Sequence, residues 1–462
     1  MGDLDPIDFI NAETLRIPFK NTQVAMADWA ASFRSWPSEI PGWRDWYRRM
    51  SLAKSGDWDR VGITHCLNLS LADPAKNEPL MASACYFWSD LLNAFLFNHG
   101  PMSPTLLDVV MLTDLDITSS INPFDLRTKP CHQIPTKQVG GWGKYISKYS
   151  HTEGPVSDME HVAFLLMWLE RFLFCGSTLG PTSNMQNIAE SLVQGTPMPL
   201  GRYLLGATYH MLHQTSRRLS AGDPAGHIGG PWWFLQLWLT VYTSKAVELP
   251  PFTDSRFPSF DFAEGEQPVH RPCISLGEAA SVVTGCRLSD DSLADWFRAF
   301  YNGFLVGNRV WFAYEPMEFE IPHRFRPEQP LRDEQSKALL SAFISPCLLL
   351  TGVAPGRSQH LSYEFYHPMV SARQIGFGQL PIGLYFINKL KAREPITSRL
   401  EFSKISKLTE SLPMGSLTGF THTPFCTRLF TAWWREWKLH LFNCRNADYL
   451  TKLTLSETPE EV

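Results

Sequence analysis

Tryptophan is the residue that most constrains what this chain can fold into. Sixteen of the 462 residues are Trp, and Phe, Tyr and Trp together make up 13% of the sequence. Such rings bury large apolar areas and pack in pairs, so we expect an interior built largely from flat side chains. Because 44% of the residues are apolar and 19% are charged, wholesale disorder is excluded.

The cysteines and the apolar stretches indicate the compartment. Nine Cys are spread along the chain without any C-x-x-C pair, which argues against a secreted disulfide framework. Residues 1–9 contain three Asp and no apolar run, so no secretory signal is visible. The longest apolar stretches, Val162–Leu169, Phe172–Cys175 and Trp232–Tyr242, are too short to span a membrane. The sequence predicts a soluble intracellular protein without a membrane partner.

Helical periodicity dominates the chain. Trp29, Phe33 and Trp36 follow the i, i+4, i+7 spacing of one helical face. Further helices are predicted at 83–93, 158–175, 201–219 and 293–306, and a Trp-rich helix is predicted to start at Pro231. The 158–175 helix is apolar nearly all round and is therefore expected to be buried, together with Trp168 and Trp238.

Turn and cap residues divide these helices. Residues 94–105 alternate and then turn at Asn98-His99-Gly100-Pro101, which predicts a short hairpin. Ser103 and Pro104 are predicted as the N-cap and first residue of the next helix. Two capping boxes, in which a hydroxyl and a glutamate cap the same helix start, are predicted at Ser157-x-x-Glu160 and Ser275-x-x-Glu278.

The predicted fold class is mainly α. It is a single large helical domain with a Trp/Phe-rich core, a short β-hairpin or two, and long loops. The expected division is a loose N-terminal arm at 1–28, the domain at 29–450 and an acidic tail at 451–462. Within the domain, Pro, Gly, Ser and Lys mark a mobile surface loop at about 118–156, and 371–452 form a basic C-terminal part.

Several blocks of sequence together resemble one family. They are YFWSDLLNAFLFNHGPMSPTLLDVVMLTDLDI at Tyr86–Ile117, HVAFLLMWLERFLFC at His161–Cys175, LGRYLLGATYHMLH at Leu200–His213, GGPWWFLQLWL at Gly229–Leu239, ARQIGFGQ at Ala372–Gln379, and Trp433, Trp434 and Trp437. In this order they resemble the plant mobile domain, also called the aminotransferase-like plant mobile domain. The arrangement looks like its MAIN-like branch (maintenance of meristems) and related transposon-borne copies.

The resemblance implies a plant protein of the nucleus. Members of the family are linked to meristem maintenance, genome stability and silencing of transposable elements, and some act beside phosphatase-like partners. No established reaction or cofactor comes with the family. The resemblance therefore implies a non-catalytic interaction domain whose partners are nuclear proteins. The alternative is a transposon-derived protein that binds nucleic acid through its basic C-terminal third.

The motifs of common enzyme classes are missing from the sequence. No lysine lies in a Gly/Ser-rich cup after a strand, as pyridoxal phosphate would require. The patterns G-x-x-x-x-G-K-[ST], G-x-G-x-x-G and G-x-S-x-G are also absent. We expect no enzymatic activity and no bound cofactor.

Two His-x₃-Cys pairs are the weak candidates for a metal site. His422 with Cys426 and His440 with Cys444 offer four N and S ligands, which suits tetrahedral zinc. The alternative is that they belong to a Trp-rich core. We favour the core, because Pro424 breaks the helical spacing of the first pair.

Other polar residues allow a functional and a structural interpretation. His210 and His213 are one helical turn apart, but no carboxylate or Cys lies near them in sequence, so ordinary satisfied histidines are favoured over ligands. Asp108, Asp114 and Asp116 offer carboxylates of the kind that binds Mg²⁺, yet Asp108 lies in a helical first turn, where a structural role is favoured.

The C-terminal part carries the candidate contacts with nucleic acid or a partner. Residues 371–452 have a net charge of +7, against −9 for 1–370. These positive charges contact phosphates or dock on the acidic body of the chain itself, and we favour the second. The candidate contact residues are Arg373, Gln374, Gln379, Lys389, Lys391 and Arg393.

Overall fold

A computed structural model describes most of the first half of the chain and parts of the second. The described residues are 12–18, 24–97, 100–119, 121, 126, 130–151, 153–243, 285–301, 342, 345–351, 361–368, 370–371 and 396–410. They form a mainly helical fold with two small antiparallel sheets, as the sequence predicts. Among the described helices, none combines the length and the apolar character needed to cross a bilayer.

The elements follow one another along the chain with few strands between them. The helices are η2 (Met26–Trp29), α2 (Trp43–Arg60), α3 (Thr64–Leu69), α4 (Glu78–Cys85), α5 (Leu106–Thr113), α6 (Trp142–Tyr149), α7 (Asp158–Met167), η4 (Trp168–Leu173), α8 (Gln186–Val193), α9 (Leu200–Ala221), α10 (Trp232–Thr243), α12 (Asp290–Tyr301) and α15 (Arg399–Glu410). The strands are β1 (Trp88–Ser89), β2 (Ala94–Phe97), β3 (Gly100–Met102), β4 (Cys347–Leu350) and β5 (Tyr363–Tyr366).

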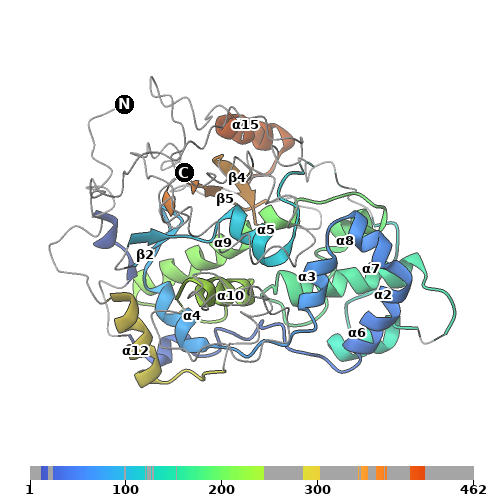
Figure 1. Ribbon diagram of the computed structural model, residues 1–462, viewed down its shortest axis with the longest axis horizontal. Helices are drawn as coiled ribbons and strands as arrows, with labels where there is room; N and C mark the ends of the chain where they lie inside the picture. The colour runs from blue at the N-terminus through green and yellow to red at the C-terminus, as the bar shows by residue number, and fades with distance from the viewer. Residues whose placement is uncertain are drawn as a thin grey trace, which may run out of the picture.

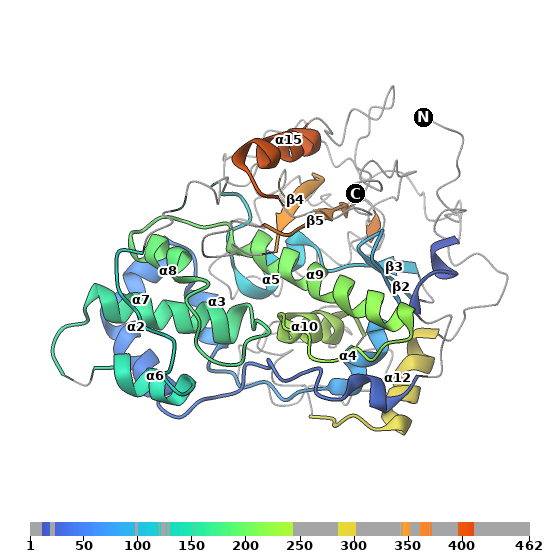
Figure 2. The same cartoon turned by 180° about the vertical axis from the view of Figure 1, so that it is seen from behind.

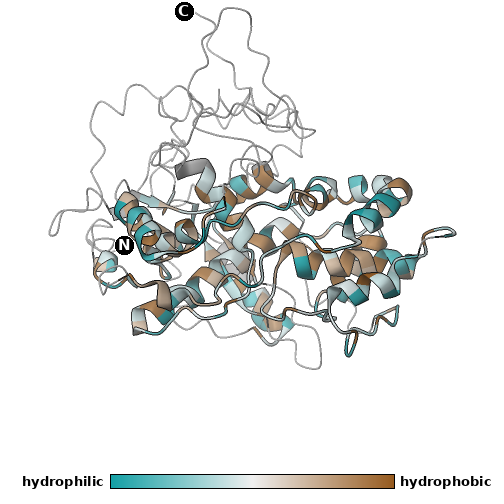
Figure 3. Ribbon diagram, turned by 90° about the horizontal axis from the view of Figure 1, so that it is seen from below, coloured by the Kyte–Doolittle hydropathy of each residue, from teal (hydrophilic) through white to brown (hydrophobic). Residues whose placement is uncertain are grey.

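Helices α9 and α10 occupy the middle of an elongated body (Figures 1 and 2). Helices α2, α3, α6, α7 and α8 gather at one end, and α4, α12 and the β1–β2–β3 sheet lie at the other. The β4–β5 hairpin and α15 lie on the side of α9 away from α10. Apolar residues run through the central helices, seen from below in Figure 3.

Aromatic rings fill the core, as the Trp content predicts. The rings of Trp43 and Phe164 stack with centroids 4.7 Å apart, and Phe97 stacks on Phe300 at 4.4 Å. Trp168 and Trp238 are buried at 1% and 0% exposure, which confirms that prediction. Stacked and edge-on pairs add to the stability gained from buried area.

The predicted hairpin is confirmed, and a third strand extends it to a three-stranded sheet. β2 pairs antiparallel with β3, with Phe95 opposite Met102 and Phe97 opposite Gly100. β1 pairs with the other edge of β2. A helix over residues 83–93 is therefore wrong. The helix starts earlier because the Asn77 side chain caps it by accepting from the Leu80 N–H, and it ends at Cys85.

One predicted N-cap is confirmed and another is wrong. Ser157 caps α7 by accepting from the Glu160 N–H at 3.1 Å. Ser103 does not cap α5. Thr105 and Asp108 form the capping box there, since the Thr105 side chain accepts from the Asp108 N–H and the Asp108 carboxylate accepts from the Thr105 N–H. The Ser275-x-x-Glu278 box lies outside the described residues.

The helices predicted at 158–175 and 201–219 are present. The first is buried, but its second half, η4, is a π-helix. The second is α9, which ends at Gly222 in the left-handed conformation. A helix through Trp29, Phe33 and Trp36 is wrong, because Ala31 has φ of 65° and η2 ends at Trp29. All three rings are nevertheless buried.

Two segments expected at the surface contribute to the fold. Residues 12–18 of the N-terminal arm pack against the body, with Ile17 buried and Glu13 only 5% exposed. The loop-rich segment 118–156 contains α6, which buries Trp142, Tyr145, Ile146 and Tyr149. These four side chains lie on one face of the helix, so their spacing explains why part of a Gly- and Lys-rich segment is ordered.

Candidate functional site

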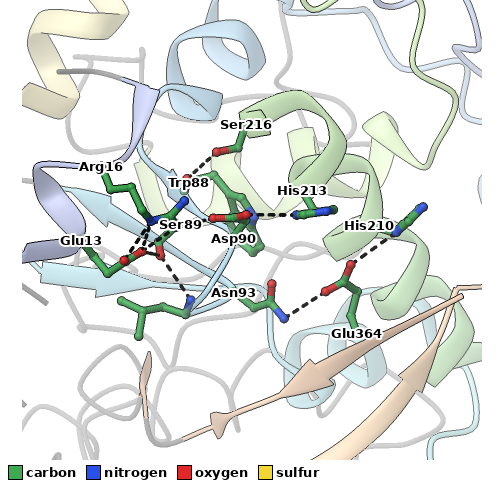
Figure 4. A network of polar contacts seen from close by, with 11 residues as sticks. Glu13, Arg16, Trp88, Ser89, Asp90, Asn93, His210, His213, Ser216 and Glu364 are labelled. Atoms are coloured by element: carbon green, nitrogen blue, oxygen red, sulfur yellow. Dashed lines mark hydrogen bonds and ion pairs between the residues drawn. The ribbon is translucent and has the colours of Figure 1, made fainter. Parts of the chain in front are cut away.

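A buried network of charged side chains lies where the turn after β1 meets α9 (Figure 4). Asp90 follows β1 in the sequence, and its carboxylate is 3.3 Å from Nδ1 of His213 on α9. Next to these two groups, the Ser216 hydroxyl donates to the Trp88 carbonyl at 2.9 Å. The turn is therefore tied to α9 at two points, one turn of that helix apart.

The N-terminal arm completes the environment of Asp90. Arg16 contacts Asp90 through Nη2 and Glu13 through Nε and Nη2, the last at 2.7 Å. The Ser89 hydroxyl donates to Glu13 at 2.7 Å and accepts from the Leu92 N–H at 3.2 Å. Glu13 and Asp90 are both buried, and Arg16 provides a positive charge that both carboxylates share.

A second histidine–carboxylate pair joins α9 to β5. Glu364 is fully buried on β5, and one of its carboxylate oxygens is 3.3 Å from Nδ1 of His210. The Asn93 amide donates to the Phe365 carbonyl at 2.9 Å and to Glu364 at 3.4 Å. Gln214 is 2.8 Å from the other ring nitrogen of His210. The network thus extends from the arm through the first sheet and α9 to the second sheet.

The electrostatics favour the ionised form of Asp90. Burial alone would raise the pKa of this carboxyl group. The hydrogen bond from His213 and the charge of Arg16 outweigh burial and hold the pKa of Asp90 well below its usual range. The carboxylate therefore stays charged in the folded protein at every ordinary pH.

Paired histidines and carboxylates are also the components of general acid–base sites. In this network, however, the neighbouring hydroxyl groups donate elsewhere. Ser89 donates to Glu13, and Ser216 donates to a backbone carbonyl. A nucleophile hydrogen-bonded to a base is the signature of covalent catalysis, and these two hydroxyls do not form one with His210 or His213. The arrangement is suited to joining segments.

Further buried charges make similar ties at the other end of the molecule. Glu160 accepts from Arg49 at 3.0 Å and from the Trp46 indole at 3.2 Å, so it turns into the core and does not reach back to Ser157 as predicted. Glu190 on α8 accepts from the N–H groups of Cys131 and His132 at 2.8 and 3.0 Å. These bonds fasten the 130–135 segment and α2 to the α7–α8 pair.

A small apolar pocket lies between α3, η4 and α10. Its lining includes Cys66, Ser70, Trp168 and Trp233. Burial raises the pKa of the Cys66 thiol, which disfavours the reactive thiolate. The Ser70 hydroxyl donates to the Leu67 carbonyl and accepts from the Trp43 indole. The pocket walls therefore supply packing surface and no activated group.

The predicted site residues have different outcomes. Asp108 has the structural role predicted, in the capping box of α5. His210 and His213 each pair with a carboxylate far away in sequence, which agrees with the favoured structural interpretation. The zinc candidates His422, Cys426, His440 and Cys444 lie outside the described residues, as do the contact candidates Arg373, Gln374, Gln379, Lys389, Lys391 and Arg393. Within the described part of the chain, no three His, Cys, Asp or Glu side chains are placed to hold a metal ion.

Sequence reasoning missed the network as a whole. Asp90 is 74 residues from Arg16, and Glu364 is 154 residues from His210. Patterns within a few residues cannot reveal pairs of this kind. The sequence feature that indicated such a network was the pair of histidines one turn apart on a largely buried helix. A buried polar side chain requires a partner, and none was near in sequence.

The described residues define a mainly helical domain with an aromatic core, whose distant segments are joined by buried ion pairs. Residues 62–246 match the family model described as plant mobile domain, which confirms the resemblance for this segment. The match includes Asp90, His210 and His213, whereas Glu13, Arg16 and Glu364 lie outside it. No curated protein and no solved structure matches the chain.

Proposed function

We propose that this chain is a non-catalytic interaction domain of the nucleus, of the MAIN-like kind within the plant mobile domain family. The proposed role is in assemblies that maintain meristems, silence transposable elements and protect genome stability. Its partners would be nuclear proteins, with phosphatase-like proteins among them. The family match over 62–246 supports the family part of this proposal.

The contacts of the buried carboxylates are the observation that supports a non-catalytic role. Asp90, Glu160, Glu190 and Glu364 are each bound by groups from another segment of the chain. Reaction centres usually leave titratable groups facing a cleft. Here the charges hold segments together, so function is expected to reside in the surface that this framework supports.

Affinity capture from plant nuclei tests the proposal. The full chain carries an epitope tag, and mass spectrometry compares the proteins it recovers with those from a tag-only sample. We expect the chain in the nuclear fraction, with silencing or phosphatase-like proteins enriched. A chain found outside the nucleus, or one that recovers nothing above the tag-only sample, would contradict the proposal.

A variant of the buried charge network distinguishes a structural role of this network from a catalytic role. Asp90→Asn is expected to lower thermal stability and partner capture together, because it loosens the scaffold. Asp45→Asn is the matched control, since Asp45 is 85% exposed on α2. If Asp90→Asn abolished the biological effect while stability and partner capture stayed unchanged, a catalytic role would be favoured instead.

A further inference from the structure

We propose that α6 and the segment before it, residues 130–148, form a surface that binds the phosphate backbone of nucleic acid. Between residues 126 and 152 the sequence contains five Lys and Arg and no Asp or Glu, although the whole chain has a net charge of −5. This positive stretch lies inside the family-matched segment. It is distinct from the basic C-terminal part, and its existence does not depend on a role in meristems or silencing.

The fold presents these charges on a rigid support. Tyr145 anchors α6 by donating to the Ala163 carbonyl at 3.0 Å, and Tyr149 donates to the Pro135 carbonyl at 2.9 Å. Lys144 and Lys148 are exposed and four residues apart, so they lie on the same face of the helix. Lys137 is exposed in the segment that precedes the helix. We call these three lysines the α6 basic face.

The charges of the α6 basic face are not neutralised by the described part of the protein. No carboxylate among the described residues lies within 4 Å of the three ammonium groups. Other lysines behave differently: Lys76 is 2.8 Å from Glu78, and Lys54 is 3.7 Å from Asp158. Lys148 is exposed, and its ammonium group lies 5.0 Å from the ring centre of Tyr149.

The composition of this surface favours a phosphate backbone over a folded protein partner. Protein interfaces are anchored by aromatic and apolar side chains, and no large apolar side chain is exposed among residues 130–151. The exposed neighbours include Gln138, Ser147 and His151, which are hydrogen-bonding groups. Phosphate contacts of this kind position nucleic acid without reading its sequence, so binding is expected to be weak and without sequence preference.

The location of α6 makes the surface separable from the C-terminal part. In Figures 1 and 2, α6 lies at the α2–α7 end of the molecule, whereas α15 lies near β4 and β5. Charge changes on α6 can therefore be made without disturbing the described part of the C-terminal region.

Fluorescence anisotropy with the full-length protein tests the proposal. The probes are a duplex and a single strand of mixed sequence at low salt. We expect the triple variant Lys137→Glu/Lys144→Glu/Lys148→Glu to bind both probes about tenfold more weakly or worse. The milder variant has Gln at the three positions. Its slope of log affinity against log salt for the duplex should be smaller in magnitude by about 2 to 3, because three fewer phosphate contacts form and fewer counterions are released on binding.

The control variant changes the net charge of the protein by the same amount, but at positions outside the α6 basic face. Arg34, Arg217 and Arg287 are exposed outside the α6 basic face, and their triple change to Glu should leave binding near the wild-type value. Equal losses in both variants, wild-type binding that survives in the α6 variant, or no binding by the wild type would overturn the proposal. Binding of polyglutamate in the absence of DNA or RNA binding would also overturn it, and would favour an acidic protein segment. Thermal melts of each variant exclude unfolding as the cause.

Discussion

At the scale of single residues, Asp90 shows how much of this fold depends on charges that meet only after folding. Its carboxylate is buried between Arg16 of the N-terminal arm and His213 of α9. Removing the Asp90 charge leaves Glu13 as the only carboxylate on Arg16 and takes away the carboxylate that faces His213. The loss is therefore expected to exceed that of an ordinary surface ion pair.

Asp90→Asn is predicted to lower the free energy of unfolding by about 1–3 kcal/mol. The amide keeps the shape of the carboxylate but carries no charge, so the contacts with Arg16 and His213 are weakened. Denaturant titration measures the effect. Asp45→Asn should change stability by less than about 0.5 kcal/mol, because its ion pair with Arg48 is exposed. Equal, small effects for the two variants would show that the Asp90 charge is not structurally important.

His161 provides a prediction about pH. Burial lowers its pKa to about 4, while an unfolded His titrates near 6.5. As pH falls from about 6.5 to about 4, the unfolded chain takes up a proton that the folded protein does not, so stability decreases. Burial also lowers the pKa of His367 to about 4, which adds to the same trend.

His161→Gln tests this assignment. The Gln oxygen can still accept the hydrogen bond that the Trp58 indole donates to His161 Nε2 at 2.9 Å. Near pH 5.5 the stability of the variant should depend less steeply on pH than that of the wild type, because unfolding takes up about one proton fewer. Urea titrations at several pH values measure this slope. A slope identical to that of the wild type would mean that His161 is protonated in the folded state.

At the scale of elements, α9 and β4 approach each other closely at Gly206. A Cβ atom placed on Gly206 would lie 2.3 Å from the Leu350 carbonyl oxygen. Only a residue without a side chain allows the helix and the strand to meet at this distance. This contact joins the family-matched segment to the second sheet.

Gly206→Ala is predicted to destabilise the protein by about 2 kcal/mol or more, because backbone atoms must move to admit the methyl group. Gly56→Ala on α2 is the matched control, since nothing lies within 4 Å of its added Cβ. The control should be stabilising by about 0.5–1 kcal/mol, as expected for a helical Gly. Thermal melts of both variants decide the matter, and similar melting temperatures would contradict this view of the α9–β4 contact.

Local sequence patterns predicted those elements whose determinants are local. The F-x-F alternation before Gly100 predicted the hairpin, and Ser157 predicted the start of α7. The start of α5 was misplaced because Ser103 and Thr105 both have a side chain that can cap a helix. Thr105 is the N-cap, since it forms reciprocal hydrogen bonds with Asp108. The direction of the Glu160 side chain depends on Arg49, 111 residues away. Such choices are made by tertiary contacts, which periodicity does not record.

At the scale of the whole molecule, the buried charges join the family-matched segment, residues 62–246, to segments that lie outside the match. The arm contributes Glu13 and Arg16, and the matched segment contributes Asp90, His210 and His213. The second sheet contributes Glu364. We therefore expect these segments to form one cooperative unit, in which the matched segment depends on the charges on either side of it.

Hydrogen exchange of the full chain with Glu364→Gln tests this cooperativity. The variant leaves His210 and Asn93 without the carboxylate that they share. Exchange should become faster in α9 and at 86–97 as well as at 361–371, because opening of a cooperative unit exposes all its parts. Glu39→Gln, at an exposed ion pair with Arg44, should affect only its own surroundings. Faster exchange confined to 361–371 would contradict the expected cooperativity.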